Sequence, residues 1–221
     1  KEGETLGFDG RVVSVGEGED YAAIAGKKNA KVNYQVDLID EIWEDRPVLS
    51  EEPAFNLDVK YAGETVASKL ARIREEMKEA GTNVHIVSTI DDICWTLNIR
   101  GNDIDFFPLV LSYGIITMDS FELYIDERKL DDKLKAKLAK DGVNLHPYND
   151  IYEDVKKFGS DVVAMIDPGK LNYALFNNIP ENVKTVEKRN PAILMKAIKN
   201  PVEIENIRKA QIKDSVAHVR F

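Results

Sequence analysis

A short segment in the middle of the chain places a guanidinium group close to two carboxylates. Arg100 is followed by Asp103 and Asp105 in a glycine-containing loop that comes after a helical stretch. A guanidinium can hold a substrate carboxylate or a peptide carbonyl through two parallel hydrogen bonds, and paired carboxylates can serve hydrolysis. A structural bond from Arg100 to Asp103, or to a neighbouring domain, explains the same pattern. The three residues are candidates for substrate access or for contacts between domains, and none is assigned a catalytic role.

The other acidic pairs and the three histidines have simpler structural explanations. The pairs at 91–92 and 131–132 each precede a helical pattern, where carboxylates cap free backbone N–H groups. His85 lies in an apolar strand pattern and is expected to be a hydrogen-bonded core residue. His146 and His218 are expected on the surface or in packing contacts, and no metal site is expected in this chain.

Sequence motifs of known chemistry are missing from the chain. It has no phosphate-binding glycine loop, no paired-cysteine metal motif, no helical His-Glu-x-x-His and no nucleophile elbow. Gly16 and Gly18 begin like a dinucleotide-binding loop, but Tyr21 stands where the third glycine belongs. The sequence therefore predicts no catalytic residue and no cofactor of its own.

The candidate residues must be positioned by alternating strands and helices, because the apolar period switches between about two and about 3.6 residues along the chain. This pattern predicts an α/β fold with a mixed sheet flanked by helices. Strands are expected at 11–15, 33–38, 84–90, 109–117, 121–126, 162–167 and 183–188. Helices are expected at 20–26, 64–80, 93–98, 131–141, 152–158 and 171–176, with a last helix capped at 200–201. The strands at 109–117 and 121–126 are predicted to form an antiparallel hairpin.

Composition limits the partners and the compartment. Hydrophobic residues make up 43% of the 221 residues and charged residues 31%, which is typical of a folded, water-soluble protein. A formal charge of -9 disfavours nucleic acid and anionic lipid, which both attract lysine and arginine, and no stretch is long enough to span a membrane. The single cysteine, Cys94, is compatible with a reducing compartment, so a cytoplasmic location is expected.

The chain shows signs of more than one domain. A polar, proline-marked segment around 44–53 is typical of a linker. The chain begins at Lys1 and ends inside a helical pattern at Phe221, so both ends are expected to be cut from a longer protein.

Five stretches in the same order resemble the three-domain Xaa-Pro aminopeptidases of the creatinase and prolidase superfamily. They are DLIDEIWEDRP at 37–47, KLARIREEM at 69–77, DDICWTLNIRGNDIDFFPLVLSY at 91–113, HPYNDIY at 146–152 and KNPVEIENIRKAQIKDSVAHVRF at 199–221. The resemblance covers nearly the whole chain. Several stretches at matching spacing are more specific than any one of them.

The resemblance implies a map of the chain. Residues 1–46 would be the end of the family's first domain, 47–53 a linker, 54–190 a complete second domain and 191–221 the entry helices of the catalytic, pita-bread domain. That third domain would hold two divalent metals, manganese or zinc, and would lie beyond residue 221. The parent would hydrolyse the first bond of peptides with proline in second position. This region would pack against its own catalytic domain and would be inactive alone.

Two other readings remain open. Some pita-bread proteins without metals bind proteins, so this chain could be a non-enzymatic binding module; a proline dipeptidase or creatinase-like hydrolase is the third reading. The last helix carries an apolar side, at Ile204, Ile207, Ile212, Val216 and Val219, that would face the catalytic domain. Without that domain, the same side is expected to pair with a second copy, which would give a homodimer.

Overall fold

A six-stranded mixed sheet forms the centre of the protein in the computed structural model, which describes residues 2–221. The strands, in the order β10-β9-β4-β6-β7-β8, are β10 (Lys184–Glu187), β9 (Val163–Ile166), β4 (Val84–Val87), β6 (Tyr113–Thr117), β7 (Phe121–Tyr124) and β8 (Val143–His146). β4, β9 and β10 are parallel, β6 is antiparallel to β4 and β7, and β8 is parallel to β7. The predicted mixed sheet and the predicted β6–β7 hairpin are confirmed.

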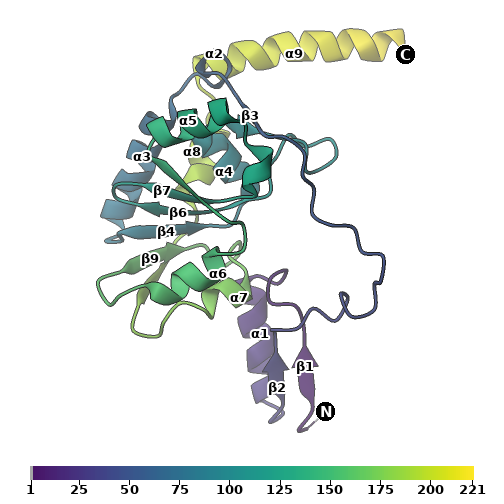
Figure 1. The fold of residues 1–221 in the computed structure, drawn as a ribbon, viewed down its shortest axis with the longest axis vertical. Coiled ribbons are helices and arrows are strands. Elements are labelled where there is room, and N and C mark those ends of the chain that lie inside the picture. Colours follow the sequence, from purple (N-terminus) through teal and green to yellow (C-terminus); the bar gives the residue numbers. More distant parts are fainter. Residues whose placement is uncertain (1) are drawn as a thin grey trace.

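One face of this sheet is covered by four helices and a 3-10 turn (Figure 1). They are α3 (Val66–Glu79), α4 (Ile90–Leu97), α5 (Asp132–Lys140), α8 (Pro191–Ala197) and η1 (Glu127–Lys129). In α3, Leu70, Ile73 and Met77 are three and four residues apart and are at most 1% exposed. Leu134 and Leu138 of α5 point into the same core, as predicted. Burial of this apolar face holds the helices on the sheet.

The opposite face is covered by shorter elements. These are α6 (Ile151–Asp154), the 3-10 turn η2 (Val155–Lys157) and α7 (Tyr173–Phe176), and Val15 at the start of α1 (Val15–Gly26) joins them. Val15 and Leu175 are fully buried against Ile166 of the sheet in a second apolar cluster. The sheet therefore has a core on each side, which fits an α/β sandwich.

The N-terminal segment forms a small unit that packs on α7. Its strands β1 (Thr5–Gly7) and β2 (Lys31–Asn33) pair in parallel, with α1 between them in the chain. Ser14 begins α1 through a capping box with Glu17. The strand predicted at 11–15 is therefore wrong, and the strand predicted at 33–38 lies instead at β2.

Two further corrections concern strand and helix starts. The strand predicted at 109–117 covers only β6, because 109–112 belongs to an irregular loop. Asp91 and Asp92 do not cap α4, since Thr89 holds the cap position and both aspartates lie in the first turn. Carboxylates there still favour the helix through its dipole.

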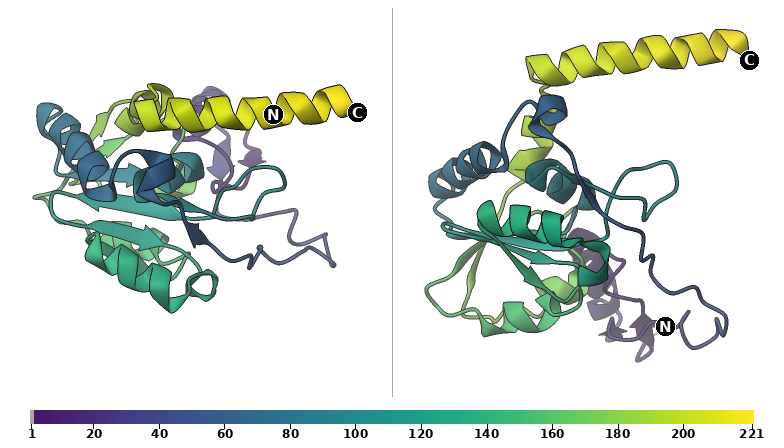
Figure 2. Two further views of the ribbon diagram at one scale, coloured as in Figure 1. Left: turned by 90° about the horizontal axis from the view of Figure 1, so that it is seen from above. Right: turned by 45° about the horizontal axis from the view of Figure 1, so that its top comes forward.

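The last helix, α9 (Pro201–Arg220), projects away from the sandwich (Figures 1 and 2). Asn200 caps it with Glu203 in a capping box, as the sequence predicted for this position. It contacts α2 (Val59–Ala62), next to the short antiparallel pair of β3 (Phe55–Asn56) and β5 (Ile99–Arg100). No residue of α9 is buried, so its apolar side is exposed.

Candidate functional site

The structure does not bring Arg100, Asp103 and Asp105 together as one site. Arg100 Nη1 donates to the carbonyl oxygens of Cys94 and Ile99, both at 2.8 Å. The bond from Arg100 to Asp103 that the sequence suggested is therefore wrong. Asp105 is exposed in the following loop.

Asp103 instead belongs to a buried ion pair. Its Oδ2 accepts a hydrogen bond from the backbone N–H of Leu111 at 2.7 Å and lies 2.5 Å from Lys129 Nζ. The two side chains of the pair are 1% and 2% exposed. Sequence analysis missed Lys129, because it lies 26 residues away on η1 and no local pattern connects it to Asp103. Among the described residues, Asp103 Oδ1 is buried without a partner.

This ion pair holds one end of a loop that presents apolar side chains to the outside. Ile104 and Phe107 form an isolated bridge, and Phe106 between them has a φ of 67°. Phe106 and Phe107 are exposed. A positive φ is unusual for an aromatic residue, so the tight turn is fixed by the surrounding loop rather than by local preference.

Arg100 lines a pocket with a buried lysine. Lys69 on α3 donates to the carbonyl oxygen of Trp95 at 2.7 Å and to Asn98 Oδ1 at 2.6 Å. Its ammonium lies 4.4 Å from the centre of the Trp95 ring. Lys69 and Arg100 both border a cavity of about 580 Å³ that is closed on one side by α9. Two cations from different elements thus meet at one cavity.

Burial makes the charged forms of Lys69 and Arg100 less favourable. It lowers the pKa of Lys69 to about 8, opposed in part by the nearby carboxylates of Glu64 and Glu203. Burial also lowers the pKa of Arg100, again opposed by Glu203. Arg100 stays charged at neutral pH because its ordinary pKa is so high.

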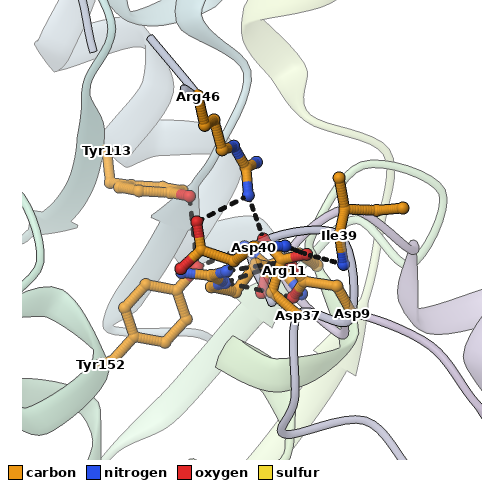
Figure 3. Close-up of polar contacts among 9 residues, drawn as sticks. Asp9, Arg11, Asp37, Ile39, Asp40, Arg46, Tyr113 and Tyr152 are labelled. Carbon is orange, nitrogen blue, oxygen red and sulfur yellow. Dashed lines mark hydrogen bonds and ion pairs between the residues drawn. The ribbon is translucent and has the colours of Figure 1, made fainter. Parts of the chain in front are cut away.

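A second cluster lies at the junction of the N-terminal unit and the sandwich (Figure 3). Arg11 pairs with Asp9 at 3.0 Å and Asp37 at 3.1 Å, and Arg46 pairs with Asp37 at 2.6 Å. A hydrogen bond from Arg46 holds the pKa of Asp37 below its ordinary range. Arg46 also pairs with Asp40. These charges link residues 9–11 to residues 37–46.

Three tyrosines of the sandwich lie beside this cluster. The hydroxyl groups of Tyr113 and Tyr152 are 3.2 Å apart, and Figure 3 shows both rings next to the charged side chains. The Tyr148 ring lies 5.1 Å from the Tyr113 ring, and all three tyrosines line a cavity of about 470 Å³. Burial raises the pKa of Tyr113, so this phenol stays protonated. The ion pairs and the phenol hydrogen bond lie where the N-terminal unit meets the sandwich, so they can stabilise the contact between these two units.

The histidines occupy structural positions. His85 Nδ1 lies 3.1 Å from the Met165 carbonyl oxygen and Nε2 lies 3.2 Å from Asn190 Oδ1, which confirms the expected core residue. His146 pairs with Glu122 on the neighbouring strand at 2.6 Å, and His218 is exposed on α9. All three agree with the expected core, packing or surface positions.

Side chains with metal-binding chemistry are dispersed. Within residues 2–221, no three of the His, Cys, Asp and Glu side chains are grouped so that they could hold a metal ion. Over the same residues, no helix combines the length and the apolar character needed to cross a membrane.

Comparison with known proteins assigns the chain to a family. A family model for the creatinase/prolidase N-terminal domain matches residues 45–203. The chain belongs to the creatinase/prolidase N-terminal domain family. This assignment confirms the resemblance predicted from the five sequence stretches.

Relatives of this creatinase/prolidase N-terminal domain are aminopeptidases. Xaa-Pro aminopeptidase 1 of Dictyostelium discoideum is 36% identical over 228 residues, which cover 98% of this chain and 36% of that protein. A protein of Sordaria macrospora named "Probable Xaa-Pro aminopeptidase P" is 34% identical over 238 residues, which cover 99% of this chain and 38% of that protein.

A solved structure matches the whole chain. The X-prolyl aminopeptidase of Caenorhabditis elegans, a cytosolic enzyme with a di-nuclear active site, is 30% identical with a TM-score of 0.94. The match covers 100% of this creatinase/prolidase N-terminal domain chain and 37% of that enzyme. The chain therefore spans a little over a third of the length of these three relatives.

Proposed function

We propose that this chain is a non-catalytic region of an Xaa-Pro aminopeptidase. The complete enzyme would hydrolyse the N-terminal Xaa-Pro bond of peptides that carry proline in second position. The observation that supports this most is the TM-score of 0.94 over the whole chain, against only 37% of the Caenorhabditis elegans enzyme. The proposed map remains 1–46 for the end of a first domain, 47–53 for a linker, 54–190 for a second domain and 191–221 for the entry to the catalytic domain.

The metals of such an enzyme would bind outside this chain. The Caenorhabditis elegans relative has a di-nuclear active site, whereas the His, Cys, Asp and Glu side chains of residues 2–221 form no group fit to hold a metal ion. As the family resemblance implies, two divalent cations, manganese or zinc, would bind in the proposed catalytic domain. Among residues 2–221, no group of side chains fits these metals.

The role of this region would be to pack domains and to shape the entrance. The exposed apolar side of α9 and the exposed loop with Phe106 are surfaces that a further domain would cover. Arg100 and Asp103 would act there by position, because one holds backbone carbonyls and the other holds a buried lysine. A cytoplasmic location is proposed from the cytosolic relative.

Hydrolysis of an Arg-Pro-Pro peptide tests the proposal. Residues 1–221 and the full-length parent would be assayed side by side with added manganese. Activity of the parent alone is the expected result. Activity of neither would favour the protein-binding module, and activity of residues 1–221 would contradict the domain map.

A further inference from the structure

A pocket of about 580 Å³ lies beside α2 and the first turns of α9, and nothing in the proposed peptidase activity uses it. Most of its wall is apolar or aromatic. These wall residues are Leu57, Tyr61, Ala62, Trp95, Pro108, Ile207 and Ala210. Three cationic side chains, from Lys69, Arg100 and Lys199, also border it, but only one carboxylate does, that of Glu203. The pocket therefore combines an apolar wall with an excess of positive charge.

The positive charge is deeply placed. Lys69 is 1% exposed, and its ammonium contacts a carbonyl oxygen, an amide oxygen and the face of the Trp95 ring, all of them neutral. An ammonium has three N–H donors, and two are used in these bonds. Within residues 2–221, neither Lys69 nor Arg100 forms an ion pair.

Arg100 has N–H groups that make no hydrogen bond to the described residues. Its Nη1 serves the carbonyl oxygens of Cys94 and Ile99, which fixes the plane of the guanidinium. Its Nε and Nη2 make no hydrogen bond to any described residue, although the side chain lines the pocket. A guanidinium edge with free N–H groups is suited to a carboxylate.

The charges at the rim are already committed. Glu203 Oε2 accepts from the backbone N–H of Asn200 at 2.9 Å, as part of the α9 cap. Lys199 Nζ donates to the carbonyl oxygen of Lys196. The Glu203 carboxylate still attracts Lys69 and Arg100 from a distance, and Glu64 attracts Lys69, but neither carboxylate pairs directly with these cations. A further negative charge in direct contact with Lys69 and Arg100 would therefore be favourable.

We propose that this pocket binds a carboxylate that carries an apolar body. The carboxylate would lie between Arg100 and Lys69, and its apolar part would pack on Tyr61, Trp95 and Ile207. Such a group is offered by a small organic acid or by an acidic side chain of another polypeptide segment. The recognising chemistry is the same for both sources.

Binding of 3-phenylpropionate to residues 1–221 tests the site. Titration would be followed at pH 7 and low salt by the indole N–H signal of Trp95, with Trp43→Phe used to assign it. Saturable binding with a dissociation constant on the order of millimolar is expected for a ligand of this size. The neutral 3-phenylpropionamide is the matched control and should bind roughly tenfold more weakly or not at all. No saturable binding of the acid, or equal binding of the amide, would overturn the proposal.

Variants separate recognition from folding. Arg100→Gln and Lys69→Met are each expected to weaken binding about tenfold. Glu203→Gln keeps a side-chain acceptor for the cap but removes the opposing charge, so it should tighten binding by roughly two- to fivefold. Arg208→Gln removes an exposed positive charge of α9 outside the pocket and should leave binding unchanged. If Glu203→Gln weakens binding as much as Arg100→Gln does, the charge argument fails, even where Arg100→Gln unfolds.

The source of the carboxylate is tested with the longer parent, and only this arm rests on the proposed function. If residues 1–221 bind the probe and the parent does not, an acidic side chain of the parent fills the pocket. If both bind with the same constant, the ligand is a free acid. Loss of peptidase activity in the parent would refute the proposed function without touching the binding result.

Discussion

Lys129 Nζ lies 2.5 Å from Asp103 Oδ2, and both side chains are almost completely buried. The pair joins η1 to the loop that follows Arg100, so it connects two segments that are distant in sequence. Removing one partner of a buried pair leaves the other charge uncompensated, which costs more than the pair itself contributes. The pair is therefore a sensitive test of how this loop is held.

Lys129→Met is expected to lower the free energy of unfolding by about 3 kcal/mol, because the Asp103 carboxylate stays buried without its cation. Lys129→Met with Asp103→Asn should recover roughly half of this loss, since the amide oxygen still accepts from Leu111. Urea unfolding at pH 7 measures both. Lys135→Met, which breaks an exposed pair with Glu127, is the control and should cost less than about 1 kcal/mol. Equal losses for the two single variants would contradict this account.

Lys69 should make the stability of the fold depend on alkaline pH. Its pKa is lowered from 10.5 to about 8 by burial, with Glu64, Glu203, Arg72 and Arg100 as the charged neighbours. Between these values the unfolded chain binds more protons than the folded chain, so the free energy of unfolding rises with pH. We expect a gain on the order of 1 kcal/mol between pH 8 and pH 10, relative to Lys69→Met.

Urea unfolding of wild type and Lys69→Met at four pH values in this window measures the difference. Lys60→Met removes an exposed lysine of α2 that is not buried in the core and serves as the control. A difference between wild type and Lys69→Met that does not change with pH would mean that Lys69 keeps an ordinary pKa in the folded protein.

Sequence patterns correctly predicted the helices whose positions depend on neighbouring residues. The stripe of Leu70, Ile73 and Met77 defined α3, and the Asn200 cap defined the start of α9, because both depend on residues within one or two turns. The contacts of the candidate site residues were predicted less well. Asp103 is fixed by Lys129, 26 residues further on, and such a partner leaves no periodic signal.

The wrong strand at 11–15 has a similar cause. The β-branched residues Val12, Val13 and Val15 favour a strand, but the capping box of Ser14 and Glu17 starts a helix there. Backbone bonds to α7, such as Tyr173 N–H to Val13 C=O at 2.8 Å, then fix the segment. Tertiary contacts of this kind override local propensity.

Glu122 should contribute to stability that is lost in acid. Burial raises its pKa, but hydrogen bonds from Ser120, His146 and Asn144 outweigh this and hold it below the ordinary value of 4.5. As pH falls below about 5, the unfolded chain takes up the proton first, so this contribution disappears as the pH falls through the lowered pKa. Glu122→Gln should therefore reduce stability at pH 7 by less than about 1 kcal/mol and flatten the loss between pH 5 and pH 3.

Thermal unfolding followed by circular dichroism at pH 3, 4, 5 and 7 measures this effect. Glu153→Gln removes an exposed carboxylate that pairs with Lys156, and it should leave the acid dependence as in wild type. The same pH dependence in Glu122→Gln and wild type would show that the hydrogen bonds from Ser120, His146 and Asn144 do not lower the pKa of Glu122.

The apolar side of α9 should drive self-association when no other domain covers it. Ile212 and Val216 are 66% and 45% exposed and lie one turn apart on this side. Burial of such side chains between two copies is favourable at roughly 25 cal/mol for each Å² removed from water. We expect residues 1–221 to form a concentration-dependent dimer by light scattering, and Ile212→Glu with Val216→Glu to remain monomeric. Lys209→Glu with Lys213→Glu, which changes the charge of α9 without touching the apolar side, is the control and should still dimerise. If the wild type stays monomeric at the highest measurable concentration, the predicted dimer is wrong. The apolar side of α9 would then be expected to contact a domain of the parent.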